Sequence, residues 1–262
     1  MKPFASAARP ALRIFVDAPL AAGRTLALPS GPARHVQVLR LQPGDTVTVF
    51  NGRASLEWPA RILRIGRQAV EVELGDALEA DREPKVAVTL AVGVPANDRM
   101  DGLIEKAGEL GAAAIQPLVC ERSVLRVAED RAEAKQRHWR AVAAAASEQC
   151  GRTRVTAVLP VRPLLAWLDA EAEAARPDDG AARDIVLSLD AAACSPAAVL
   201  ADGPRAVRVL SGPEGGLTPA EEHAAVARGF MPVGLGPRVL RADTAPLAVL
   251  AWLGLQDAKG GE

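Results

Sequence analysis

Cysteine and tyrosine are scarce or absent in this sequence. It contains three cysteines and no tyrosine, and aromatic residues make up 3% of its 262 residues. The cysteines, Cys120, Cys150 and Cys194, are widely spaced and form no CxxC pair, so nothing points to a zinc site or a thioredoxin-like dithiol. An odd number of isolated cysteines fits a reducing compartment better than a disulfide framework.

Long apolar segments are also missing. The longest uncharged apolar run near the C-terminus, residues 245–255, is well short of the roughly 20 residues that span a bilayer. Arg9 and Arg13 interrupt the first residues before the apolar core of a signal peptide can form. We therefore expect a soluble, cytoplasmic protein without a membrane partner.

The common local signatures of catalysis are absent as well. The sequence has no GxxxxGK[ST] phosphate loop, no GxGxxG after a strand, no HExxH and no GxSxG. Its three histidines, His35, His138 and His223, lie too far apart in sequence for a local metal motif. These absences argue against metal catalysis and against a serine-type triad, and we expect no metal cofactor.

The residues that are present have an ordinary globular composition with an uneven charge distribution. Hydrophobic residues make up 49% and charged residues 24%, and the net charge is -1. Residues 1–75 contain ten basic and five acidic side chains, a net charge of +5, whereas the remainder has a net charge of -6. A basic front end is typical of a nucleic-acid-binding domain, and it is equally consistent with a solvated charged face.

The first 75 residues have the pattern of a small β domain. Short β-rich runs at 13–16, 46–50 and 69–74 are separated by turn residues, with Pro43-Gly44 and Asn51-Gly52 as the clearest turns. This pattern predicts strands in hairpins that close into a small β-barrel over residues 1–75. Residues 76–84 are polar, end in proline and are predicted to be a linker.

From residue 85 to 262 the pattern changes to strands that alternate with helices. Strands are predicted at 85–94, 113–119, 184–189, 205–210 and 231–235. Helices are predicted at 98–110 and 129–149, after Thr218 and after Thr244. This alternation is typical of an α/β domain in which a parallel sheet has helices on both faces.

A glycine-rich turn at 211–217 is the clearest candidate for a binding site. Thr218 and Glu221 form a capping box, and Pro219 takes the first helical position, so the turn lies between a strand and a helix N-terminus. Ligands of open parallel sheets bind at such places, although a merely tight turn explains the glycines equally well. The turn contains Gly212, Gly215 and Gly216.

A second candidate element, residues 235–244, also connects a strand to an apolar helix. Arg238, Arg241 and Asp243 could together grip an anionic substrate and manage a proton. In the alternative interpretation, Asp243 or Thr244 is a helix N-cap and the two arginines are surface residues.

Four segments in a fixed order resemble a known family. They are 121–124 (Glu-Arg-Ser-Val), 147–152 (Ser-Glu-Gln-Cys-Gly-Arg), 212–217 (Gly-Pro-Glu-Gly-Gly-Leu) and 235–241 (Leu-Gly-Pro-Arg-Val-Leu-Arg). Together with 35–41 (His-Val-Gln-Val-Leu-Arg-Leu) and the following Pro43-Gly44-Asp45, they are similar to the RsmE-type 16S ribosomal RNA (uridine-N3) methyltransferases of the SPOUT superfamily. The resemblance spans nearly the whole chain.

The resemblance implies a PUA-like RNA-binding β-barrel followed by a SPOUT methyltransferase domain with a trefoil knot at its C-terminal end. No periodicity argument predicts a knot, because true knots are very rare. It also implies a homodimer that binds S-adenosyl-L-methionine at the knot. The implied cofactor-binding residues are Leu187, Leu189, Leu210, Gly212, Pro213, Glu214, Gly215, Gly216, Leu235, Gly236, Val239 and Leu240.

The reaction implied by the resemblance is methylation of the N3 atom of a uridine. Asp243 or Glu214 would act as base, and Arg238 or Arg241 would stabilise the developing charge. The candidate RNA contacts are Arg9, Arg34, Arg40, Arg122 and Arg152, the last two also being candidates for dimer contacts. Four positions depart from the family pattern: Gln37, Ala96, Thr156 and Asp243.

The substrate is expected to be ribosomal RNA in the assembled small subunit. With few aromatic side chains available to stack on bases, shape and backbone contacts must contribute more to recognition, and a folded particle presents both. Two alternatives remain. The chain could be a SPOUT methyltransferase for a different RNA, or a non-catalytic RNA-binding assembly factor.

Overall fold

The fold is taken from a computed structural model that describes residues 12–67, 69–96, 98–123, 129–173 and 182–257. The chain divides into two compact units, of which the first consists of residues 1–83 and 144–155. The second consists of residues 84–143 and 156–262. The sequence predicts a continuous domain over 85–262, whereas the segment 144–155 belongs to the first unit.

The first unit is a β-sheet with a helix packed against it. Its elements are β1 (Arg13–Phe15), β2 (Thr25–Ala27), α1 (Ser30–Val38), β3 (Thr46–Phe50), β4 (Leu56–Ile65), β5 (Val70–Leu74) and β6 (Leu78–Glu79). The strand order is β1-β3-β4-β5-β2, and β6 pairs with β4 inside the segment predicted to be a linker. Only β1 and β3 form a parallel pair among these described strands.

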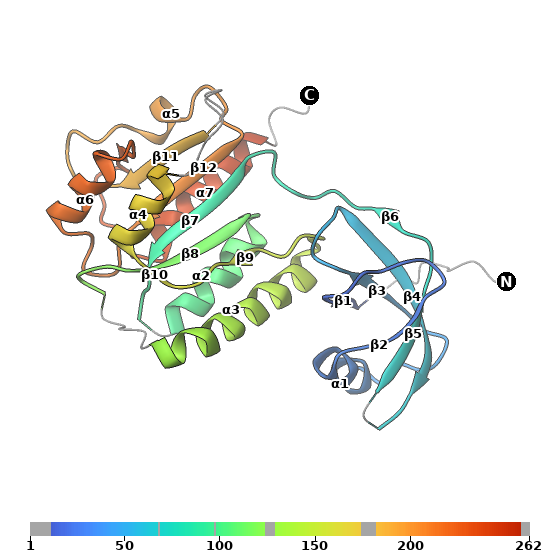
Figure 1. Cartoon of the computed structure of the whole chain (residues 1–262). Helices are drawn as coiled ribbons and strands as arrows, with labels where there is room; N and C mark the ends of the chain where they lie inside the picture. The colour runs from blue at the N-terminus through green and yellow to red at the C-terminus, as the bar shows by residue number, and fades with distance from the viewer. Residues whose placement is uncertain (1–11, 68, 97, 124–128, 174–181, 258–262) are drawn as a thin grey trace. The chain divides into compact units, whose positions relative to one another are not determined.

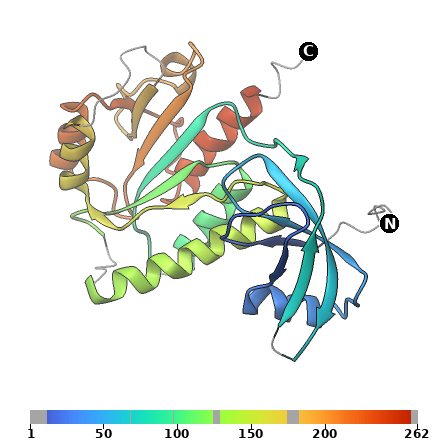
Figure 2. The same cartoon turned by 45° about the vertical axis from the view of Figure 1, so that its right-hand side comes forward.

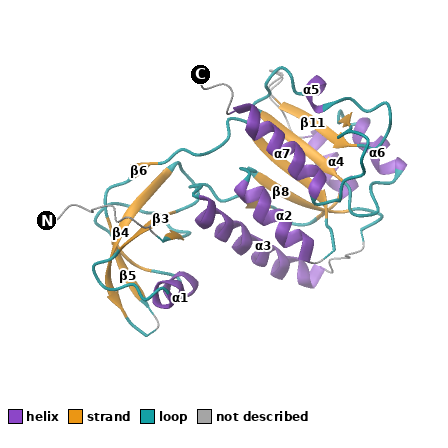
Figure 3. Ribbon diagram, turned by 180° about the vertical axis from the view of Figure 1, so that it is seen from behind, coloured by secondary structure: helices purple, strands orange, loops and turns teal. Residues whose placement is uncertain are grey.

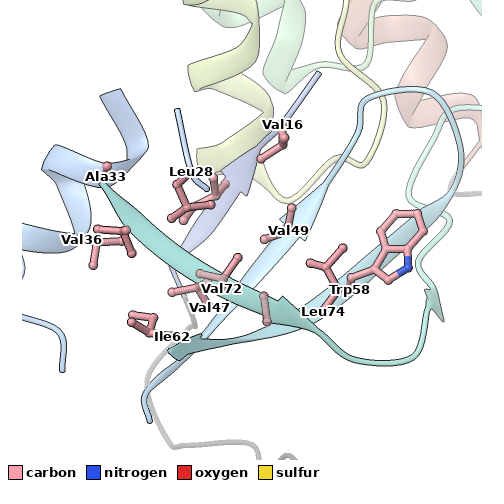
Figure 4. Close-up of a cluster of buried hydrophobic side chains, with 13 residues drawn as sticks. Val16, Leu28, Ala33, Val36, Val47, Val49, Trp58, Ile62, Val72 and Leu74 are labelled. Atoms are coloured by element: carbon pink, nitrogen blue, oxygen red, sulfur yellow. The ribbon is translucent and has the colours of Figure 1, made fainter. Parts of the chain in front are cut away.

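Alternating side chains build the core of this unit. Every second residue of β5 is buried, and β3 follows the same alternation up to Val49, as expected for strands with one face toward a core. Helix α1 contributes Ala33 and Val36. Figure 4 shows these side chains turned toward those of the strands, among them Val47 and Val72.

The segment 144–155 is tied to the N-terminal strands by polar contacts. The backbone N–H of Phe15 donates a hydrogen bond to Oε1 of Glu148 at 2.8 Å. The Arg152 guanidinium donates from Nε to Glu83 at 3.0 Å and forms an ion pair with the same carboxylate. Arg13 donates to the Arg152 carbonyl at 3.1 Å. These contacts make the segment an integral part of the first unit.

The second unit alternates strands and helices. Its elements are β7 (Ala87–Gly93), α2 (Asp98–Glu109), β8 (Ala114–Val119), α3 (Glu129–Cys150, whose last residues belong to the first unit), β9 (Ala157–Val158), β10 (Arg162–Pro163), α4 (Leu164–Glu173), β11 (Ala182–Leu187), α5 (Pro196–Val199), β12 (Ala206–Ser211), α6 (Pro219–Val226), β13 (Met231–Val233) and α7 (Thr244–Asp257). The structure confirms the predicted strands and helices of this part and adds β9, β10, α4 and α5.

The described strand pairs of this unit are all parallel, in the order β10-β8-β7-β12-β11-β13, with β9 paired to β8. Helix α7 passes behind the strands in Figures 1 and 2 and, together with α2, lies in front of them in Figure 3, whereas α4 and α6 cover the opposite face. This confirms the predicted α/β architecture. The trefoil knot depends on how the chain threads, which strand order alone does not define, and it stays a prediction.

The parallel order brings distant parts of the sequence to one edge of the sheet. The carboxyl ends of the neighbouring strands β11, β12 and β13 lie at Leu187, Ser211 and Val233. Loops that follow these ends are the usual place for ligands in such sheets. Among the residues that the structure describes, no helix is long and apolar enough to cross a membrane.

Candidate active site

A cavity of about 580 Å³ lies at the carboxyl ends of β11, β12 and β13. Its volume is in the usual range for small-molecule sites, roughly 300–1,000 Å³. Three loops supply most of the lining, at 187–190, 211–217 and 235–242, and the remaining lining residues are Arg99, Arg122, Glu222, Val233 and Ala245. The structure thus brings together the three segments that the sequence predicts for the cofactor.

The glycine-rich loop between β12 and α6 is shaped by residues without side chains. A Cβ atom on Gly212 would lie 2.6 Å from the Leu217 backbone nitrogen, so the loop cannot close in this way with a larger residue. Gly216 adopts φ 70°, which favours glycine. The loop ends at Thr218, which accepts a hydrogen bond from the Glu221 N–H in the predicted capping box.

Glu221 also holds the loop after β8. Its Oε1 accepts a hydrogen bond from the Glu121 N–H at 2.8 Å, while Oε2 accepts one from the Thr218 N–H at 2.8 Å. Burial, followed by the negative charge of Glu221, raises the pKa of the neighbouring Cys120 thiol to about 12. Cys120 is therefore a neutral packing residue rather than a nucleophile.

Arg122 connects the same loop to the glycine-rich loop. Its guanidinium donates to the carbonyl oxygens of Gly215 at 3.0 Å and of Leu217 at 3.4 Å. The sequence predicts Arg122 as an RNA or dimer contact, and the structure places it in the cavity wall with these two carbonyl partners. Nothing in the local sequence shows this role, because the partners lie more than 90 positions away.

Glu214 is held by the loop between β7 and α2. Its Oε1 accepts a hydrogen bond from the Ala96 N–H at 3.0 Å and lies 3.4 Å from the Arg99 guanidinium. Arg99, three residues after Ala96, supplies a positive charge beside this carboxylate. Sequence reasoning missed Arg99, which became visible only through its contact with Glu214.

The loop after β13 presents the predicted arginines to the cavity. Arg238 and Arg241 are exposed and line it, together with Val239, which is 77% exposed. Within the described part of the chain, the side chains of both arginines make no ion pair. They are therefore available to an anionic ligand.

Asp243 follows this loop and does not line the cavity, although its neighbour Ala242 does. Its Oδ1 is buried without a hydrogen-bond partner among the described residues. Helix α7 begins at the next residue, Thr244, whose N–H donates to the Arg241 carbonyl at 3.0 Å. Asp243 thus occupies the predicted place before the helix but makes no capping bond through Oδ1.

One predicted cofactor residue requires correction. Leu210 has no exposed surface and packs in the core with Trp167 and Phe230, because it precedes the cavity end of β12. The next residue, Ser211, lines the cavity instead. The other predicted cofactor residues lie in its wall, and the sequence analysis missed lining residues outside the three predicted loops: Asp190, Glu222, Val233 and Ala245.

The predicted RNA contacts of the first unit fall into three groups. Arg34 and Arg40 are exposed and make no side-chain hydrogen bond or ion pair within the described residues. Arg152 is 5% exposed and paired with Glu83, so its guanidinium is not available to phosphates, and we correct its assignment to a structural one. Arg9 lies outside the described residues.

Two family models match the chain. One described as "RNA methyltransferase domain" matches residues 82–254, and one described as "RNA methyltransferase PUA domain" matches residues 33–75. The ribosomal RNA small subunit methyltransferase E of Synechocystis is 32% identical over 228 residues, which cover 87% of this chain and 72% of that protein. Its namesake in Bacillus subtilis is 28% identical over 225 residues, covering 84% and 86%.

Solved structures agree with these matches. A ribosomal RNA small subunit methyltransferase E from Neisseria gonorrhoeae, bound to S-adenosyl methionine, has a TM-score of 0.83 and 32% identity, and the match covers 94% of this chain and 98% of that chain. A methyltransferase from Legionella pneumophila in complex with the bound cofactor SAM has a TM-score of 0.82 and 31% identity over the same shares.

Proposed function

This chain belongs to the ribosomal RNA small subunit methyltransferase E family. We propose that it methylates the N3 atom of a uridine in 16S ribosomal RNA, with S-adenosylmethionine as the methyl donor. The observation that carries the proposal is the cavity at the carboxyl ends of β11, β12 and β13. It is lined by the three predicted loops, and a relative with the same fold binds S-adenosyl methionine.

The residues of this cavity fit the cofactor. Gly212 and its neighbours let backbone N–H and C=O groups approach a ligand closely, and a Cβ at Gly212 would disrupt the loop. Leu187, Leu235 and Leu240 line the cavity and would offer apolar surface to the cofactor. Polar groups, which fix the orientation of a ligand in such sites, come from Ser188 and Arg122.

The bound cofactor would supply an electrophilic methyl group on a sulfonium. The task of the protein is then to hold the uridine and to favour its N3 anion, because protonated N3 is a poor nucleophile. Arg238 and Arg241, which line the cavity, would stabilise that negative charge. Correct positioning of the two reactants contributes as much as any base.

Between the two base candidates, Asp243 is favoured over Glu214. One oxygen of Glu214 is already bound by the Ala96 N–H and approached by Arg99, so this carboxylate orients the loops. Oδ1 of Asp243 has no such partner among the described residues, and it follows the cavity wall directly.

The larger assembly is part of the same proposal. The first unit would bind RNA as a PUA-like domain, and the second unit would form the methyltransferase domain with its knot. The protein would act as a homodimer on the assembled small subunit, and ribosomal RNA as substrate implies a cytoplasmic location. Leu189 and Val239, 76% and 77% exposed beside the cavity, are apolar surface that a partner subunit or a ligand would cover.

The test is mass spectrometry of nucleosides from unmodified small ribosomal subunits incubated with the purified protein and S-adenosylmethionine. We expect N3-methyluridine on subunits and less of it on naked RNA. Formation of another methylated nucleoside would support methyltransferase activity and show that the target atom or base is a different one. If neither substrate is methylated, the proposal is wrong and a non-catalytic RNA-binding role takes its place.

A further inference from the structure

Helix α1 ends in a turn that normally contains glycine. Leu39 is its C-cap, the Arg40 N–H donates to the Gln37 carbonyl at 3.0 Å, and the Leu41 N–H donates to the Val36 carbonyl at 3.2 Å. These two bonds define a Schellman motif, in which the residue after the cap is left-handed. Arg40 takes that position with φ 55°, and it is the sole non-glycine residue with positive φ among those described.

Nothing inside the fold explains an arginine at this position. In the left-handed backbone conformation, a residue with a side chain is less stable than glycine, because its Cβ approaches the following carbonyl oxygen. The Arg40 side chain is exposed and makes no hydrogen bond or ion pair to any residue that the structure describes. Strained residues of this kind gather at binding sites, where the side chain serves a ligand.

Exposed apolar residues lie directly beside Arg40. Val38 is 69% and Leu39 is 50% exposed, although α1 buries Ala33 and Val36 on its other face (Figure 4). Arg34 precedes Val38 by four residues and therefore lies on the same side of the helix. The end of the helix thus combines two positive charges with two exposed aliphatic side chains.

A third arginine adjoins the same place. The Gln37 side chain donates a hydrogen bond to the Gly66 carbonyl at 2.8 Å, which fixes the turn between β4 and β5 next to the end of α1. Arg67 follows Gly66 directly, is exposed and makes no ion pair within the described residues. The Gln37 side chain thus holds this turn beside the end of α1.

We propose that the α1-end surface, formed by Arg34, Val38, Leu39, Arg40 and Arg67, binds an unpaired segment of RNA. The arginines would contact successive phosphates, and Val38 and Leu39 would pack against the face of an unstacked base. That the ligand is RNA rests on the proposed function. The unpaired state follows from the surface itself, since the bases of an A-form duplex are stacked on one another and offer no free face to an aliphatic side chain.

The aliphatic pair takes a role that aromatic residues usually have. Single-stranded nucleic acids are commonly bound by stacking on exposed rings next to a basic groove. In the described part of the first unit, Phe50 and Trp58 are 0% and 5% exposed, and Phe15 packs against Phe50. Val38 and Leu39 are therefore the exposed apolar groups available beside the arginines.

The experiment measures binding of the full-length protein to a fluorescein-labelled oligouridine of about 12 nucleotides, by fluorescence anisotropy over a range of salt concentrations. A duplex of the same length serves as the second probe. Arg40→Gly should weaken oligouridine binding at least about fivefold and flatten the slope of log K against log salt by about 0.7, the value for one phosphate contact on a single strand. Its thermal midpoint should stay the same or rise, since glycine relieves the strained backbone.

Two further variants separate charge from apolar contact. Leu39→Asn should weaken oligouridine binding about threefold without changing the salt slope, because no phosphate contact is lost. Arg53→Ala is the matched control. Arg53 already pairs with Asp17 and follows the C-terminal end of β3, whereas α1 precedes the N-terminal end of that strand. The expected change in oligouridine affinity is less than about twofold.

The outcomes separate this inference from the proposed function. The α1-end surface is not a site for unpaired RNA if Arg40→Gly binds oligouridine like the wild type. The same conclusion follows if Arg40→Gly and Leu39→Asn lose as much affinity for the duplex as for oligouridine. Both results hold whether or not the protein methylates subunits. If the variants show the expected losses of oligouridine binding and the protein has no methyltransferase activity, the α1-end surface is supported and the proposed activity is wrong.

Discussion

The Glu221 carboxylate accepts a hydrogen bond from the backbone N–H of Glu121 across 100 positions of sequence. Through its other oxygen it caps the helix that follows the glycine-rich loop. One buried side chain therefore fixes two walls of the cavity with respect to each other, and the capping box seen in the sequence is half of its role.

Replacing Glu221 with alanine should lower the free energy of unfolding by about 1–3 kcal/mol, because two backbone N–H groups lose their acceptor. Cofactor affinity, measured by calorimetry, should fall as well. Glu105→Ala is a suitable control, since Glu105 is half-exposed and its ion-pair partner among the described residues is the surface residue Lys106. Equal stability of the two variants would show that Glu221 does not hold the loops.

The Arg122 guanidinium should act on cofactor binding more than on turnover. Arg122→Ala removes the donor to the Gly215 and Leu217 carbonyls, and we expect KM for S-adenosylmethionine to rise about three- to tenfold with a smaller change in kcat. Arg122→Lys keeps the charge and should recover part of the loss. A variant with normal cofactor KM but weakened RNA binding would return Arg122 to the RNA contacts.

Gly212→Ala should strongly weaken cofactor binding without unfolding the second unit. The added methyl would lie 2.6 Å from the Leu217 nitrogen and 2.8 Å from the Gly216 carbonyl carbon, so the loop backbone must move. We expect at least about a tenfold loss of affinity by calorimetry. Gly102→Ala is the control, because nothing lies within 4 Å of its new methyl group and helix α2 should gain up to about 1 kcal/mol.

The Arg152 side chain should prove structural. Arg152→Ala leaves the Glu83 carboxylate, whose side chain is 14% exposed, without its partner, and the free energy of unfolding in urea should drop by about 3–5 kcal/mol. Arg34 is exposed and has no ion-pair partner in the described part of the chain, so Arg34→Ala should change this free energy by less than about 0.5 kcal/mol. If Arg152→Ala weakens RNA binding at unchanged stability, the assignment is wrong.

Glu148 should make the protein less stable as the pH rises. Burial raises the pKa of its carboxyl above the usual 4.5, so the folded state holds the proton more tightly than the unfolded state. Stability is lost as the pH rises from about 4.5 through the raised pKa, and the full loss persists at neutral pH. Glu148→Gln keeps the acceptor for the Phe15 N–H and has no proton to lose.

The variant should therefore match the wild type in urea unfolding near pH 4 and exceed it at pH 7. A difference of the same size at both pH values would exclude titration of Glu148 as the cause.

Local sequence patterns predicted the helices that are stabilised by residues close to one another in the sequence. Helix α2 has an apolar stripe and ends before Gly111, which adopts φ 91°, and helix α6 has its capping box. Helix α1 was missed, because its first turn contains Gly31 and Pro32 and its N-cap makes no side-chain hydrogen bond. It is held by Ala33 and Val36 against the sheet.

Strand β4 was missed for a related reason. It contains Pro59, which normally argues against a strand, yet Pro59 lies opposite Thr48 in the antiparallel pair with β3. In the site, the loops that contain glycine and arginine could be predicted from local sequence. The hydrogen bonds of Arg99, Arg122 and Glu221 could not, because they join residues 90 or more positions apart. No local pattern contains such pairs.

The return of residues 144–155 to the first unit limits how this protein can be engineered. A fragment that ends at residue 83 would leave the Phe15 N–H and the Glu83 carboxylate without Glu148 and Arg152. Exchange of the first unit with that of a relative would need matched junctions after Glu83, before Ala144 and after Val155. The two units are thus not interchangeable modules, and a chimera with a single crossover between them should fail to fold.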